Sequence, residues 1–136
     1  MYQHTDASPQ PLTPARENYL RALYQLSHSG GSVRLTDLAR RQGVRLSTAR
    51  HFVKRLRAVG LAEQKEYGRI TLTDHGMTMG REITDRFNLM RDFLTEVLGV
   101  SEEVAEREAC MMEHHLDEDT LNRLAKFVKR VTRGKE

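Results

Sequence analysis

The sequence predicts a mostly α-helical protein with one small β-hairpin, organised as a winged helix-turn-helix followed by a helical dimerisation region. Over most of the chain, apolar residues recur at spacings of three and four, which is typical of helices that bury one face. After Gly60 the spacing changes to alternation, and two short predicted helices come just before that change. With 136 residues, the chain can bury one core, or two small cores that share a long helix.

The N-terminal segment is predicted to be a loose arm followed by a helix. Residues 1–13 are polar and lack apolar periodicity, and all three prolines lie at or before Pro14. Residues 15–27 then carry one apolar stripe, and Gly30 and Gly31 end that helix. The stripe consists of Tyr19, Leu20, Leu23, Tyr24 and Leu26.

Residues 14–75 are predicted to complete a winged helix-turn-helix domain. Thr36 and Asp37 stand where a helix N-cap is expected, and Gly43 can end that helix with a positive φ. Ser47 can cap the next helix, which Gly60 closes. Its inward face is Ala49, Phe52, Val53 and Leu56. Alternating residues 61–65 and 69–73 then form a hairpin around a Tyr67-Gly68 turn.

Residues 76–136 are predicted to form a helical dimerisation and metal-binding domain. Asp74 can cap a long helix that ends at Gly99, and Ser101 and Asp117 can cap two further helices. The long helix has one apolar face, made of Met79, Ile83, Phe87, Met90, Leu94 and Val97. Since this face exceeds what one small domain can cover, we expect a homodimer.

The charge distribution predicts a surface for a polyanion. Residues 34–69 contain ten basic and three acidic residues, whereas residues 101–122 contain eight acidic residues and one arginine. A helix fits the major groove, and hydroxyls and arginines can bond base edges and phosphates. The residues expected to face double-stranded DNA are Arg45, Ser47, Thr48, Arg50, His51 and Lys54 on the helix, with Lys65 and Arg69 on the wing. The alternative is a solvated polar face or a protein interface.

Several classes of protein are excluded by the same sequence. The N-terminus has no basic segment followed by an apolar run, and no stretch approaches eighteen apolar residues, so secretion and membrane spanning are not expected. Cys110 is the only cysteine, which rules out an intramolecular disulfide and favours a cytoplasmic location. No His-Glu-x-x-His motif and no nucleophile with a neighbouring base are found, so we expect no enzyme.

A second constellation lies near the C-terminus. In a helix, Cys110, Glu113 and His114 share one face, and together they could bind a transition metal ion. The alternative is a buried cysteine beside an exposed Glu-His-His segment, with the neighbouring methionines filling the core.

Taken together, residues 15–131 resemble the diphtheria toxin repressor and manganese transport regulator family of metal-dependent repressors. The resemblance rests on residues 17–24 of the first helix, residues 55–61, Leu72-Thr73-x-x-Gly76, and Glu108-Ala109-Cys110-x-x-Glu113-His114. It implies a dimer formed through the helices after the wing, a palindromic operator, and Fe²⁺ or Mn²⁺ as corepressor. The family's SH3-like domain is not expected from this sequence, so the resemblance is to a short form of the family.

The resemblance also implies a reduced metal site. Cys110, Glu113 and His114 match metal-binding positions, and Asn18 stands where the family's first helix supplies a methionine or aspartate ligand. Phe87 stands where a histidine ligand is expected. Two arginines also depart from the pattern: Arg21 stands where the manganese type has a glutamate, and Arg91 where the iron type has an acid. We therefore expect one ion per subunit, Fe²⁺ or similar, with Mn²⁺ a poorer corepressor because a thiolate softens the site.

The predicted function is that of a sequence-specific DNA-binding transcriptional repressor that responds to metal. Two alternatives remain open from the sequence. One is a metal-independent winged-helix repressor that responds to an organic ligand or to oxidation of Cys110. The other is a metal-binding or scaffolding protein that does not bind DNA.

Overall fold

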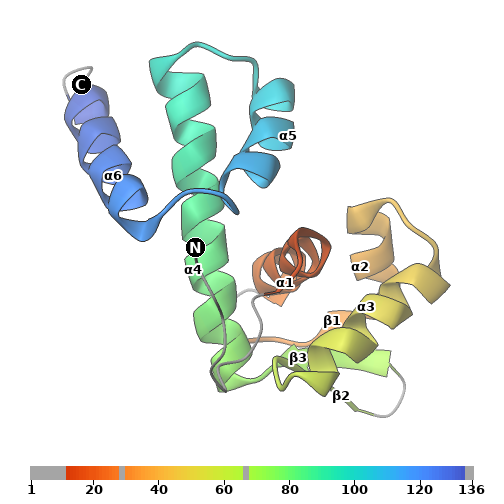
Figure 1. Ribbon diagram of the computed structural model, residues 1–136. Coiled ribbons are helices and arrows are strands. Elements are labelled where there is room, and N and C mark those ends of the chain that lie inside the picture. Colours follow the sequence, from red (N-terminus) through yellow and green to blue (C-terminus); the bar gives the residue numbers. More distant parts are fainter. Residues whose placement is uncertain (1–11, 28–29, 66–67, 134–136) are drawn as a thin grey trace, which may run out of the picture.

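The structure, a computed structural model, describes residues 12–27, 30–65 and 68–133 (Figure 1). Most of the predicted arm, and Tyr67 of the predicted turn, lie outside the described residues. The N-terminal half is built, in chain order, from α1 (Pro14–Ser27), β1 (Val33–Arg34), α2 (Leu35–Gln42), α3 (Leu46–Ala58), β2 (Ala62–Gln64) and β3 (Arg69–Leu72). The C-terminal half contains α4 (Asp74–Asp92), the π-helical segment η2 (Phe93–Val97), α5 (Glu102–Met112) and α6 (Glu118–Arg133).

The predicted hairpin is confirmed as β2 and β3, and it carries a third strand. The sheet has the order β1-β3-β2 and is antiparallel, with Val33 opposite Ile70 and Arg34 opposite Arg69. Strand β1 has only two residues, which is too short to show alternation in the sequence. Its pairing ties the segment before α2 to the wing.

The helices of the helix-turn-helix begin two or three residues earlier than their polar residues suggest. Helix α2 starts at Leu35 and α3 at Leu46, after extended residues Arg34 and Arg45 that make no side-chain capping bond. Gly43, with φ of 66°, does end α2. At the start of α4 the cap is the hydroxyl of Thr73, not Asp74.

Helix α4 belongs to both halves of the molecule. Its first turns pack on α1 and the sheet, and its later turns pack on α5 and α6 (Figure 1). The close approach at its start requires a glycine, because a Cβ on Gly76 would lie 2.0 Å from the backbone oxygen of Leu61. Beyond Asp92 the helix widens into η2, and Gly99 with φ of 72° follows its end.

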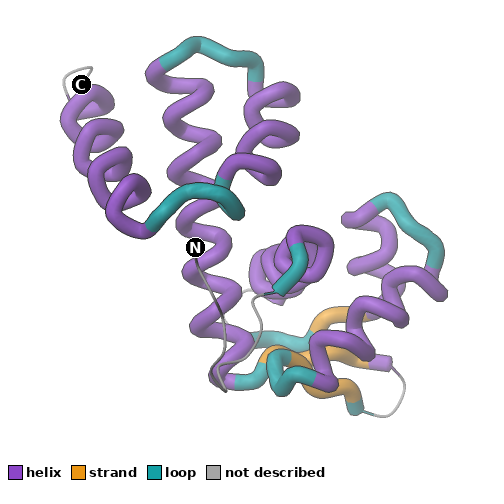
Figure 2. Tube along the Cα trace, viewed as in Figure 1, coloured by secondary structure: helices purple, strands orange, loops and turns teal. Residues whose placement is uncertain are grey.

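Two hydrophobic clusters lie on either side of the middle of α4. The first fills the winged helix with residues such as Leu20, Leu38 and Ile70, and the second joins α4, η2, α5 and α6 around Phe87 and Met90. Figure 2 shows the strands gathered at one end of a molecule that is otherwise helical. The predicted fold class is therefore confirmed.

None of the helices in the described part of the chain is both long enough and apolar enough to cross a membrane.

Candidate metal centre and DNA-binding surface

Helix α3 presents a polar face to solvent, and its opposite face is packed against the core. Its inner residues Ala49, Val53 and Leu56 are fully buried, and the ring of Phe52 stacks on Tyr19 of α1 with ring centroids 4.1 Å apart. Stacked aromatic pairs of this kind fix helices against each other beyond the area that they bury.

The residues predicted to face DNA lie on the outside of this half. The exposed residues are the N-cap residue Arg45, then Ser47, Arg50, His51 and Lys54 on α3, and Lys65 and Arg69 at the wing, whereas Thr48 is half-buried. The Arg69 guanidinium donates a hydrogen bond to the Ser32 hydroxyl over 3.3 Å, which positions the wing side chain. This exposure is compatible with DNA contact, and the individual contacts stay predictions.

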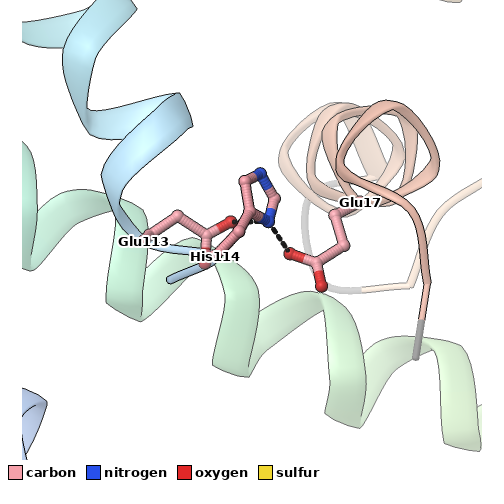
Figure 3. Close-up of side chains that lie close together, drawn as sticks. All are labelled: Glu17, Glu113 and His114. Carbon is pink, nitrogen blue, oxygen red and sulfur yellow. Dashed lines mark ion pairs between the residues drawn. The ribbon is translucent and has the colours of Figure 1, made fainter. Parts of the chain in front are cut away.

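The candidate metal centre is formed by Glu17, Glu113 and His114, which come from both halves of the molecule (Figure 3). Glu17 projects from the first turn of α1, whereas Glu113 and His114 follow the end of α5. Their potential ligand atoms all lie within 4.8 Å of one another. The Nδ1 atom of His114 is 2.7 Å from Oε1 of Glu17 and 3.2 Å from Oε1 of Glu113.

Apart from the close contacts of His114 with the two carboxylates, these buried donors lack hydrogen-bond partners, as the ligands of a metal ion would. Oε1 of Glu17, Oε1 of Glu113 and both ring nitrogens of His114 have no partner in hydrogen-bonding geometry among the described residues. Buried polar atoms normally find partners, and leaving them without one is costly. Two carboxylates and an imidazole are donors suited to divalent iron or manganese. The residues present therefore fit a divalent cation.

The electrostatics of the site also suit a cation. Burial is the main cause that raises the pKa of Glu17 from its usual 4.5 to about 8, and the adjacent Glu113 carboxylate adds to the shift, while Arg86 and Arg21 oppose it. Burial also lowers the pKa of His114, against the attraction of Glu113, so its imidazole is neutral at pH 7. A neutral imidazole is the form that binds metal.

A cleft and an arginine complete the surroundings. Nε of Arg86 on α4 lies 3.3 Å from Oε2 of Glu113, so this carboxylate is oriented through one oxygen and keeps the other for a ligand. A cleft of about 510 Å³ between α1, α4 and α6 reaches Glu17, Glu113 and His114 and gives an entry path from solvent.

The structure brings together two of the four predicted ligands. Glu113 and His114 meet in the cluster, whereas Cys110 is not part of it; the Cys110 thiol instead accepts a hydrogen bond from Nη2 of Arg21 over 3.3 Å. The Oδ1 atom of Asn18 is buried and has no hydrogen-bond partner in the part of the chain that the structure describes. Glu17 was missed, although it is adjacent to Asn18 in the sequence and is the acidic residue of the first turn of α1.

The positions that depart from the family pattern form a compact group next to the cluster. The guanidinium of Arg21 lies over the ring of Phe87 at 3.8 Å, and that of Arg91 lies 5.8 Å from the same centroid. Phe87 itself is buried. Fixed positive charge and an aromatic ring thus occupy this region, which disfavours a second metal ion beside the first.

Two family models match the chain in succession. Residues 11–70 match the model of the iron dependent repressor N-terminal DNA binding domain, and residues 73–135 match that of the iron dependent repressor metal binding and dimerisation domain. The boundary between the two matches falls just before α4, and the division near residue 75 stays a prediction.

Curated relatives and solved structures resemble the chain over most of its length. The Transcriptional regulator MntR of Escherichia coli O157:H7 is 35% identical over 114 residues, 84% of this chain and 73% of that protein. An uncharacterized HTH-type transcriptional regulator of Methanocaldococcus jannaschii is 31% identical over 115 residues, which cover 84% of this chain and 92% of that protein.

Among solved structures, the manganese regulator SloR superposes with a TM-score of 0.75 at 24% identity. A manganese-dependent transcriptional repressor complex with manganese superposes with a TM-score of 0.72 at 28% identity. The matches cover 87% and 84% of this chain but 55% and 52% of those chains, so the chain spans about half the length of these two structures.

Proposed function

The chain belongs to the iron-dependent repressor family, and we propose that it is a repressor in which one divalent metal ion per subunit controls operator binding. Members of this family are DNA-binding, dimerising transcriptional regulators, not enzymes. The observation that carries the proposal is the cluster of Glu17, Glu113 and His114, in which buried donor atoms lie close together with no hydrogen-bond partner among the described residues.

The positions of these three residues suggest how metal binding can change the affinity for DNA. Glu17 lies on α1 of the winged helix, and Glu113 and His114 lie in the dimerisation half. A divalent ion supplies positive charge and coordination bonds to all three. Without it, burial and the neighbouring Glu113 carboxylate favour a protonated Glu17, so no coordination bonds would join the two halves at this site. With it, Glu17, Glu113 and His114 would be held together and would fix the winged helix in one orientation on the dimer.

The donor set bears on which metal is preferred. The expectation that Mn²⁺ is a poor corepressor depended on a thiolate ligand from Cys110, and the thiol contacts Arg21 instead. Two carboxylates and an imidazole are mostly hard donors, which suit Mn²⁺ as well as Fe²⁺. We therefore propose either ion, at one per subunit.

The DNA-binding half completes the proposal. In a dimer, two α3 helices would enter successive major grooves of a palindromic operator about one helical turn apart. Ser47, Thr48 and His51 would contact base edges, and Lys65 and Arg69 would contact phosphates. A repressor of this kind works where the chromosome lies, which we propose is the cytoplasm.

The test compares DNA binding with metal and with a chelator. Genomic fragments retained by the protein are labelled, and their affinity is measured by fluorescence anisotropy with EDTA, Mn²⁺ or Fe²⁺ under anaerobic conditions. We expect at least tenfold tighter binding with metal, since allosteric couplings of this kind amount to about 5- to 150-fold. His114→Ala should lose this gain. Glu82→Gln, which changes an exposed acid on the same cleft, should keep it.

Each alternative has a distinct outcome in this assay. Equal affinity with chelator and with metal identifies a metal-independent repressor, and no retained DNA under any condition identifies a metal-binding or scaffolding protein. Loss of the metal effect in Cys110→Ser but not in Glu17→Gln would replace the proposed ligand set by the one predicted from the sequence.

A further inference from the structure

Three arginines from different elements line one groove on the outside of the winged helix. Arg34 ends β1, Arg50 lies on α3, and Arg69 begins β3 at the wing. All three are exposed, and the groove between them measures about 560 Å³. We call this feature the arginine groove.

The arginine groove holds like charges in an unfavourable arrangement. Arg34 and Arg69 are direct partners across the antiparallel pair of β1 and β3, and like charges opposite each other destabilise a sheet. Arg50 adds a third positive charge to the same groove. Exposed strand positions accept many residue types, so the fold alone does not require arginine at both positions.

The described residues do not neutralise this charge. Within the described ranges, no carboxylate forms an ion pair with any of the three arginines. Asp37, the acidic residue nearest to Arg34 in the sequence, pairs instead with Arg40 at 3.5 Å. The hydrogen bond from Arg69 to Ser32 orients the guanidinium but leaves its charge unchanged.

An anion placed in the groove would turn the repulsion into attraction. Guanidinium groups match the oxygens of a phosphate with paired hydrogen bonds, which makes arginine the preferred residue for phosphate recognition. The first turn of α3 opens on the same groove through Leu46, and its N-cap residue Arg45 makes no side-chain capping bond, so backbone N–H groups there add to the attraction.

We propose that the arginine groove binds one phosphate group of the DNA backbone, which Arg34, Arg50 and Arg69 share. The inference rests on the proposed operator binding and adds to it a position on β1, outside both α3 and the hairpin. The phosphate belongs to DNA because the groove lies between α3 and the wing, the two elements that approach the duplex. The free protein bears the repulsion, and DNA relieves it.

The first experiment measures stability without DNA. Thermal unfolding of wild type and Arg34→Gln is followed at low salt and at high salt, with Arg123→Gln as the control, since it removes one exposed positive charge from α6. We expect Arg34→Gln to melt at a higher temperature than wild type at low salt, and the difference to vanish when salt screens the charges. Arg123→Gln should not be stabilised. A lower melting temperature for Arg34→Gln than for wild type at low salt would show that the arginines do not destabilise the free protein.

The second experiment measures the salt dependence of DNA binding with the metal present. Loss of one phosphate contact lowers the slope of log affinity against log salt by about 1. We expect this loss in Arg34→Gln and an unchanged slope in Arg123→Gln. If wild type binds DNA and Arg34→Gln keeps the full slope, the arginine groove inference is wrong while the proposed function stands. If wild type binds no DNA, the proposed function is wrong, and the inference that the three arginines share a DNA phosphate is wrong as well.

A third measurement separates DNA from a free anion. Millimolar inorganic phosphate is added at constant ionic strength, and the melting temperatures of wild type and Arg34→Gln are compared. We expect phosphate to raise the melting temperature of wild type more than that of Arg34→Gln, which would support an anion site. The same rise combined with an unchanged DNA salt slope in Arg34→Gln would assign the groove to a small anion and overturn the contact with DNA.

Discussion

Replacing Glu17 by Gln should stabilise the metal-free protein. The pKa of Glu17 is raised from 4.5 to about 8, so the folded protein holds a proton that the unfolded chain releases in this range. Stability contributed by the neutral carboxyl is therefore lost as pH rises from about 4.5 to about 8, and the loss stays constant above. Gln carries no charge at any of these pH values and avoids the loss.

The size of the effect follows from the shift. At face value the pKa change corresponds to about 5 kcal/mol, and the partial solvent access of Glu17 reduces this to roughly 2 kcal/mol. We therefore expect Glu17→Gln to be more stable than wild type by about 2 kcal/mol at pH 8, and by little at pH 4.5. Urea denaturation in EDTA across this pH range measures the difference.

Metal should make wild type more stable than Glu17→Gln, which reverses the order expected in EDTA. A ligand present at a hundred times its Kd stabilises the folded state by about 2.7 kcal/mol, and Glu17→Gln lacks the carboxylate needed to gain it. Wild type should thus gain stability with Mn²⁺ while Glu17→Gln does not. The reasoning is refuted if Glu17→Gln is the less stable protein in EDTA at pH 8, or if it gains as much from Mn²⁺ as wild type.

Three further predictions concern the site and the fold. Metal affinity measured by calorimetry should fall as pH drops from 8 to 6, because protons compete for Glu17, whose pKa is about 8; an affinity independent of pH would exclude Glu17 as a ligand. Gly76→Ala should cost more than about 3 kcal/mol of unfolding free energy, since its Cβ would lie 2.0 Å from a backbone oxygen, and a stable variant would contradict this contact. Met111→Glu should weaken the dimer in sedimentation experiments, because Met111 is a large apolar side chain that is 58% exposed in the dimerisation half, and an unchanged dimer would place the interface elsewhere.

The fold was largely predictable because its signals are local. Apolar periodicity located the helices, and the change of spacing after Gly60 located the hairpin. The details that failed depend on contacts between distant segments. Strand β1 exists because it pairs with β3, and α2 and α3 begin at Leu35 and Leu46 despite polar residues placed further along. The π-helical end of α4 has no sequence signal of its own.

The candidate metal centre was only half predictable, and the geometry of two helices explains why. Adjacent residues of a helix point about 100° apart, so Glu17 and Asn18 face different directions and periodicity does not say which one faces α5. Similarly, the predicted set assumed that the helix through Cys110 continues to His115, but α5 ends at Met112. Beyond that end His114 no longer follows the helical spacing from Cys110.

The same geometry explains how a short chain can couple metal binding to DNA binding. The ligands come from α1 and from the end of α5, and both helices pack against α4, so the cluster closes a triangle of three helices. Helix α1 also carries Tyr19, whose ring stacks on Phe52 of α3. A change at Glu17 is thus separated from the DNA-facing helix by one helix and one aromatic contact. We expect Phe52→Ala to leave metal affinity unchanged but to reduce the metal-dependent gain in DNA affinity, because it removes the aromatic contact and leaves the metal ligands in place. Calorimetry measures the metal affinity of this variant, and fluorescence anisotropy measures its DNA affinity. A full metal-dependent gain in Phe52→Ala would show that the coupling uses other contacts.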